Sequence, residues 1–161
     1  NLLESYKQYA IKLETDINRF IEAQNVPYFS GYKQALEEIK NGKKTNHWIW
    51  YIFPQLRCLG RSSTAIYYGI ADKSEAQRYL EDAVLGQRLR EISAALLAHT
   101  NKTAEEIFGV TDAIKVRSCM TMFDFLSPND IFGEVLDSFY GGERCEITLK
   151  VMTAEIFTPQ R

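Results

Sequence analysis

Residues 42–55 read GKKTNHWIWYIFPQ and gather the side chains best suited to bind or transform a small molecule. Both tryptophans of the chain and one of its two histidines lie in this window. His47 is the one residue of the window that exchanges a proton near neutral pH, so it is the candidate general acid or base. Lys43 is a candidate partner for a phosphate or carboxylate, and Trp50 offers a flat surface on which a base or sugar stacks.

Four further polar residues occur where ligand contacts are plausible. Gln24 continues the apolar face of its helix and Gln55 follows a proline, so each amide needs a hydrogen-bonding partner if it is buried. Arg117 and Ser118 interrupt an apolar segment, and an inward arginine requires a carboxylate or phosphate beside it. We expect these four residues to line one site together with Lys43, His47 and Trp50.

Each of these features also has a purely structural interpretation. Residues 42–44 would form a solvated turn, the aromatic residues would be core, and His47 would bond a backbone carbonyl. Aromatic residues at helical spacing belong to the core more often than to a binding site. The two glutamines would then hydrogen-bond to polar groups of loops, and Arg117 would be solvated. Both the functional and the structural interpretation stay open.

Several common functional classes lack support in the sequence. The Gly-rich fingerprints of nucleotide-binding loops and the Gly-x-Ser-x-Gly of hydrolases do not occur. Three widely spaced cysteines, Cys58, Cys119 and Cys145, predict reduced thiols in a cytoplasmic protein rather than disulfides. No histidine–cysteine cluster suggests a metal site, and no cofactor is predicted. The net charge of −2 gives no general attraction to nucleic acid, and no apolar run predicts a membrane span.

The elements that position these residues are predicted from helical periodicity. Within the window, Thr45 or Asn46 is predicted to cap a helix of two turns that Pro54 ends by Phe53. That helix would place His47 and Trp50 on one side. Apolar residues at three- and four-residue spacing predict further helices over 17–24, 32–39, 84–97, 114–126 and 131–139, and only 67–70 and 151–157 suggest extended structure.

The length and composition predict one all-α domain. A chain of 161 residues with 45% hydrophobic residues is able to bury a single core. We expect a compact irregular array of about seven to nine helices, packed by ridges in grooves. Residues 16–153 would form the domain, 1–15 a helical N-terminal extension, and 154–161 a C-terminal tail.

The window and several other stretches resemble the bacterial family DUF1810, a domain of unknown function of which some members are labelled calpastatin. The resemblance covers about residues 16 to 150 and is carried by 19–24, 32–36, 42–55, 59–62, 84–89, 104–109, 115–123 and 139–142. It implies a mainly helical fold and supplies no reaction. Asp82 and Ala83 stand where the resemblance has a His-Pro pair, and Cys145 stands where it has an aspartate.

Two functions from different classes follow from these residues. The first is a domain that binds a small anionic or nucleotide-like ligand and, if it is an enzyme, turns that ligand over. His47 would act as its acid or base, Lys43 and Arg117 would hold the anion, and Trp50 would stack. The second is a non-enzymatic protein-interaction or regulatory module. Calpastatin-type inhibitors are disordered, whereas the composition of this sequence is typical of a compact domain. The sequence therefore does not resemble such an inhibitor.

Overall fold

The computed structural model describes residues 2–3 and 16–157, which contain ten α-helices and two 3-10 helices and no strand. This confirms the predicted all-α array. The elements in chain order are α2 (Asn18–Gln24), α3 (Tyr32–Lys40), α4 (Ile49–Ile52), η1 (Arg57–Leu59), α5 (Ser63–Tyr67), α6 (Lys73–Glu81), α7 (Leu85–Leu96), η2 (Leu97–His99), α8 (Ala104–Phe108), α9 (Val110–Leu126), α10 (Ile131–Tyr140) and α11 (Glu146–Phe157).

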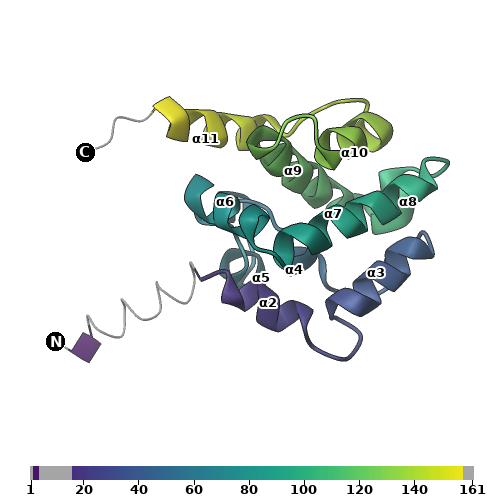
Figure 1. Ribbon diagram of the computed structural model, residues 1–161, viewed down its shortest axis with the longest axis horizontal. Coiled ribbons are helices and arrows are strands. Elements are labelled where there is room, and N and C mark those ends of the chain that lie inside the picture. The colour runs from purple at the N-terminus through teal and green to yellow at the C-terminus, as the bar shows by residue number, and fades with distance from the viewer. Residues whose placement is uncertain (1, 4–15, 158–161) are drawn as a thin grey trace.

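The second half of helix α9 passes through the interior, where its side chains are buried on all sides. From Ser118 to Phe123 every residue is buried. Helices α6, α8, α10 and α11 pack against it, and Figure 1 shows α10 and α11 beside it in the upper part of the view. Side chains that project from α9 therefore come from a rigid element.

A second layer forms around α7, whose apolar stripe includes Leu85, Leu89, Ile92 and Leu96. Helices α3, α6 and α10 pack against α7, which crosses the middle of Figure 1. Helix α2 packs against the short α4. Within the window 42–55, Trp48, Ile49 and residues 51–54 are buried, whereas Lys43, Thr45 and His47 are exposed.

The largest differences from the predicted elements are in α4 and α11, and α9 also begins at Val110 rather than near residue 114. Helix α4 begins at Ile49 and not at Thr45 or Asn46, because the backbone N–H groups of these two residues bind a carboxylate from α3. Residues 151–157 are helical rather than extended, as the end of α11. The end of α4 before Pro54 is as predicted. Residues 4–15 and 158–161 of the expected extension and tail lie outside the described residues.

Gly109 joins α8 directly to α9 and has a φ of 82° and a ψ of 164°. Only glycine adopts this backbone conformation readily. We expect Gly109→Ala to lower the free energy of unfolding by about 1–3 kcal/mol, measured by urea denaturation. An added Cβ would meet no atom within 4 Å, so backbone strain alone causes the loss. A loss below about 0.5 kcal/mol, as for an ordinary surface substitution, would contradict this account.

Candidate functional site

A buried carboxylate, Glu38, occupies the position that an external anion was expected to take at residues 43–47. Its Oε1 accepts hydrogen bonds from the backbone N–H groups of Thr45 at 2.6 Å and Asn46 at 2.9 Å. The indole Nε1 of Trp48 donates to the same oxygen at 3.0 Å. The side-chain amides of Asn46 and Gln34 donate to Oε2 at 2.8 and 3.0 Å. The loop therefore does bind an anion, but the anion belongs to the protein.

The surroundings of Glu38 keep it ionised. Burial alone would raise its pKa, but the hydrogen bonds from Asn46, Thr45 and Gln34 outweigh burial and lower the pKa to about 2. A carboxylate that accepts several N–H bonds holds the chain around it in place. Residues 45–48 are thus fixed by α3 and have a structural role.

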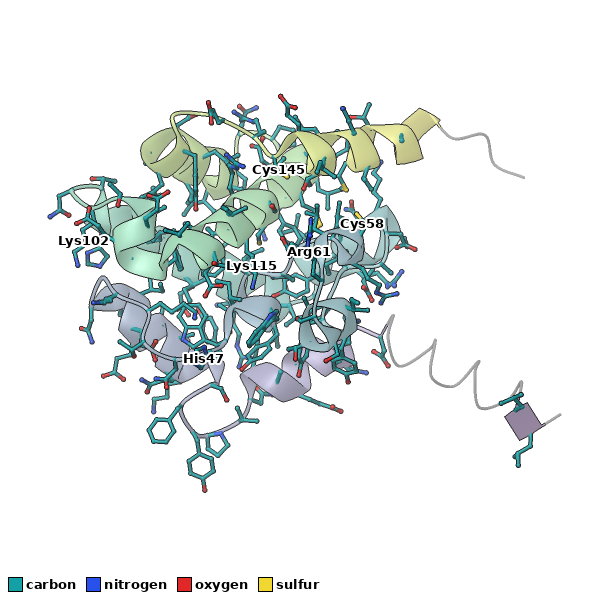
Figure 2. All side chains as sticks on the ribbon, turned by 180° about the vertical axis from the view of Figure 1, so that it is seen from behind. His47, Cys58, Arg61, Lys102, Lys115 and Cys145 are labelled. Atoms are coloured by element: carbon teal, nitrogen blue, oxygen red, sulfur yellow. The ribbon has the colours of Figure 1, made fainter. Side chains whose placement is uncertain are left out.

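His47 and Lys43 both lie at the surface, outside this network. The imidazole of His47 makes no hydrogen bond with the described part of the chain, and Figure 2 shows His47 well apart from Lys115 and Cys145. The structural lysine of the window is Lys44, which pairs with Asp112 at 2.8 Å and lies over the Trp48 ring. Neither His47 nor Lys43 lines one of the cavities described below.

Gln24 is buried and its amide is satisfied inside the core. Its Nε2 donates to the carbonyl of Tyr51 at 2.7 Å and to the hydroxyl of Tyr79 at 3.2 Å. Its Oε1 accepts from Arg88 at 3.2 Å. Each of these partners belongs to the protein, so Gln24 ties α2 to α4, α6 and α7.

Trp50 and Gln55 do come together, with Lys115 of α9 as a third polar partner. The ammonium of Lys115 lies 5.5 Å from the centre of the Trp50 ring and 3.4 Å from Asp112. The hollow between these side chains has a volume of only about 10 Å³, room for one water molecule. A nucleobase does not fit there unless Lys115 leaves the ring.

Arg117 and Ser118 lie at a different place, beside the start of α11. Arg117 lines an open cavity of about 630 Å³, which falls in the range of small-molecule sites. We call this cavity the Arg117 groove. Its lining residues are Arg117, Glu143, Arg144, Cys145, Glu146, Ile147 and Leu149.

The arginines of the groove differ in how they are held. Arg144 donates to the carbonyl of Gly142 at 2.8 Å and to Asp124 at 3.2 Å. Arg117 has one long contact of 3.8 Å with Glu143, whose side chain is 78% exposed. The Nε of Arg117 is buried and has no hydrogen-bond partner. Because the Arg117 side chain as a whole is 32% exposed, its guanidinium is open to an oxygen ligand that enters the groove.

Residues 14–152 match the sequence model of a protein family, described as 'Protein of unknown function (DUF1810)'. The chain belongs to the DUF1810 family. Among solved structures, this DUF1810 chain is similar to the conserved hypothetical protein Rv1873 from Mycobacterium tuberculosis, determined at 1.38 Å. The two are 38% identical with a TM-score of 0.81, over 86% of this chain and 97% of that chain. Comparison with curated proteins gives no match.

Within the described residues of this DUF1810 domain, no group of three or more His, Cys, Asp and Glu side chains is placed to hold a metal ion. The same part of the chain contains no helix that is long and apolar enough to cross a membrane.

Two residues at these cavities were missed from the sequence. Lys115 stands in the same polar interruption of α9 as Arg117, so a signal for it was present. Cys145 stood out only as a departure from the DUF1810 pattern, because cysteine is not a usual residue before a helix and Gly141 and Gly142 indicate only a turn. The structure therefore divides the predicted residues into a filled core network, a closed Trp50 hollow and the open Arg117 groove.

Proposed function

We propose that this DUF1810 domain binds a small anion, a carboxylate or phosphate of low molecular weight, in the Arg117 groove. The observation that supports this proposal is Arg117, whose side chain is 32% exposed in an open cavity of about 630 Å³ and is held by one long contact of 3.8 Å. Its Nε is unpartnered as well, which is rare for a buried nitrogen in folded proteins. A planar guanidinium binds carboxylate and phosphate through two parallel hydrogen bonds.

The two carboxylates of the groove do not oppose this assignment. Glu143 is 78% exposed and its contact with Arg117 is long, so the pair contributes little and is easily replaced. Glu146 is exposed and stands in the first turn of α11. These carboxylates also offer acceptors for an ammonium group, so a ligand of the amino-acid type fits the groove as well as a simple anion.

The comparison of the two cavities favours the groove over the Trp50 hollow. The hollow is only about 10 Å³ in volume, and Lys115, which lines it, already holds its ammonium over the ring on which a base would stack. The groove needs no side chain to move before a ligand enters. No proton-transfer step is assigned to His47, because its imidazole lies outside both cavities.

A second candidate function, binding of a protein partner, is favoured by one observation. The loop between α2 and α3 exposes Tyr28 and Phe29 by 74% and 72%, beside the half-exposed Val26. Aromatic residues are enriched in the centres of protein interfaces. This loop is remote in sequence from the groove, and its substitution separates the two functions.

The proposal is tested by a thermal-shift screen of citrate, glutamate, inorganic phosphate and nucleoside monophosphates, followed by calorimetry of any ligand found. A ligand at 100 times its dissociation constant adds about 2.7 kcal/mol, which raises Tm by several degrees in a domain of this size. We expect Arg117→Gln to weaken binding by about tenfold or more, because a charged hydrogen bond is lost.

The control variants are His47→Ala, Lys43→Met and the pair Tyr28→Ser with Phe29→Ser. Each should leave the affinity within about twofold of the wild type, since these residues do not line the groove. If His47→Ala or Lys43→Met weakens binding as much as Arg117→Gln does, the ligand binds at the loop and the assignment to the groove is wrong. If no anion shifts the wild type, binding of a protein partner becomes the better hypothesis.

A further inference from the structure

The face of α9 that carries Arg117 is covered over only part of its length. Four residues of α9 follow one another at four- and three-residue spacing and therefore share this face: Val110, Ile114, Arg117 and Thr121. Helix α11 packs along α9 (Figure 1), and Thr121 is 1% exposed and accepts the backbone N–H of Cys145 at 3.0 Å. The face is thus covered at Thr121, bears the Arg117 groove one turn earlier, and is open beyond it.

The open part of this face is apolar. Val110 is 70% exposed and Ile114 is 54% exposed. Ile147, which lines the Arg117 groove from α11, is 56% exposed. At a rise of 1.5 Å per residue, the stretch from Val110 to Arg117 is about 10 Å long, so one short peptide spans it. Exposed apolar side chains that gather beside a groove are typical of binding surfaces.

The polar groups of the groove match one end of a peptide chain. Of its two arginines, Arg117 is the one open to an oxygen ligand, because Arg144 already pairs with Asp124 at 3.2 Å. Glu143 and Glu146 are exposed carboxylates of the lining and accept hydrogen bonds from N–H groups. A C-terminal residue presents a carboxylate, a backbone N–H and a side chain. The arginine, the glutamates and the apolar residues therefore each have a counterpart in it.

We propose that the Arg117 groove binds the C-terminal end of a peptide whose last residues are apolar. The terminal carboxylate pairs with Arg117 through two parallel hydrogen bonds. The last side chain contacts Ile147, and the side chains before it lie along Ile114 and Val110. On α9 the bound segment continues the cover that α11 provides at Thr121. The carboxylate contact rests on the proposed function, whereas the apolar contact does not.

The size of the groove favours a peptide over a free amino acid or a phosphate ion. Cavities of the size of this one, about 630 Å³, hold ligands of the size of a drug molecule, which is also the size of a short peptide. A free amino acid would leave Val110 and Ile114 in water. A phosphate ion would contact the guanidinium of Arg117 and none of the apolar residues.

The experiment measures the retention of two synthetic peptide libraries by the immobilised full chain. Both consist of hexapeptides randomised at the last three positions, one with a free terminal carboxylate and the other with a terminal amide. Retained peptides are identified by mass spectrometry. We expect the free acids to be retained about tenfold better than the amides, because the charged pair with Arg117 is lost in an amide. Leucine, isoleucine, valine and phenylalanine should be enriched at the last two positions. Equal retention of the two libraries, or retention without this enrichment, would overturn the proposal.

Variants separate the carboxylate contact from the apolar contact. Arg117→Gln should weaken the best free-acid peptide about tenfold and leave its amide unchanged. Ile114→Ser should weaken the same peptide about fivefold but leave the binding of glutamate within about twofold, because glutamate does not reach this residue. Ile66→Ser is the matched control, since Ile66 of α5 is 42% exposed and does not line the groove. It should change neither affinity.

The outcomes distinguish this inference from the proposed function. If glutamate or inorganic phosphate binds and requires Arg117, whereas neither library is retained, the inference fails and the proposed function stands. If acids and amides are retained equally and only Ile114→Ser weakens them, the surface binds apolar chain without an anion, and both fail. The comparison of acids with amides uses the wild type alone, so it decides even where a variant does not fold.

Discussion

Arg19→Met is expected to lower the free energy of unfolding by about 3–5 kcal/mol, because it leaves the carboxylate of Glu75 buried without its partner. Both side chains lie almost completely out of solvent. The guanidinium reaches the two carboxylate oxygens at 2.8 and 2.9 Å. A buried ion whose partner is removed costs far more than the pair itself contributed.

Arg19 also donates hydrogen bonds to three backbone carbonyls, and the loss of these bonds further lowers the free energy of unfolding. It donates to Asp16, Tyr67 and Gly69, each at 2.8 Å. Through these bonds α2 is tied to the end of α5 and the turn before α6. Arg19→Lys should therefore also be strongly destabilising, because an ammonium cannot repeat the planar arrangement.

Urea denaturation of the wild type and variants measures this effect. Arg90→Met is the matched control, since Arg90 pairs with Asp130 at 2.9 Å but is 41% exposed. A surface pair of that kind contributes about 1 kcal/mol or less. The double variant Arg19→Met with Glu75→Leu should recover part of the loss, because no buried charge remains. Equal losses for Arg19→Met and Arg90→Met would contradict the argument.

Glu38→Gln is the second large effect, with an expected loss of about 2–4 kcal/mol. A glutamine keeps one acceptor oxygen but turns an NH₂ group toward the side-chain amides of Gln34 and Asn46, which are donors. These bonds are lost unless both amides turn over, and the N–H groups of Thr45, Asn46 and Trp48 keep only a neutral acceptor in place of a carboxylate. The loop 42–48 should then separate from α3, and Trp48 should become more exposed.

Acid dependence provides an independent measurement on the same residue. The pKa of Glu38 in the folded protein, about 2, lies below the ordinary value of 4.5. The stabilisation from Glu38 is therefore complete above about pH 4.5 and is lost as the pH falls toward 2. Unfolding free energies of the wild type should decline more steeply over that interval than those of Glu38→Gln. The neighbouring Glu37→Gln, at an exposed position of α3, should leave the slope unchanged, and equal slopes for all three proteins would refute this role of Glu38.

Most of the fold was predictable from the sequence because most helices carry a local apolar stripe, as the buried stripe of α7 shows. The end of α11 lacked such a signal, and residues 151–157 were wrongly predicted to be extended. The loop at 45–46 was not predictable in the same way. Its side chains are good caps locally, but the carboxylate of Glu38, on a different helix, takes the N–H groups instead.

The candidate site was less predictable for the same reason. Gln24 looked like a ligand contact since its partners, Tyr51 and Arg88, are distant in sequence. Trp50 and Gln55 line one hollow as expected, but with Lys115 over the Trp50 ring its volume is only about 10 Å³. Arg117 was recognised as a polar interruption, whereas Cys145 becomes visible only when the start of α11 lies against α9.

The hydrogen bonds to Glu38 also determine how strongly the loop 42–48 binds a free anion. The carboxylate is tethered to the same chain as the donors it binds, so its effective concentration at them is at least in the millimolar range. A free phosphate displaces the tethered carboxylate only if its concentration is far higher or its hydrogen bonds to the loop are far stronger. The loop is therefore an anion-binding site whose ligand, the Glu38 carboxylate, belongs to the same chain. This covalent connection disfavours the binding of free anions there.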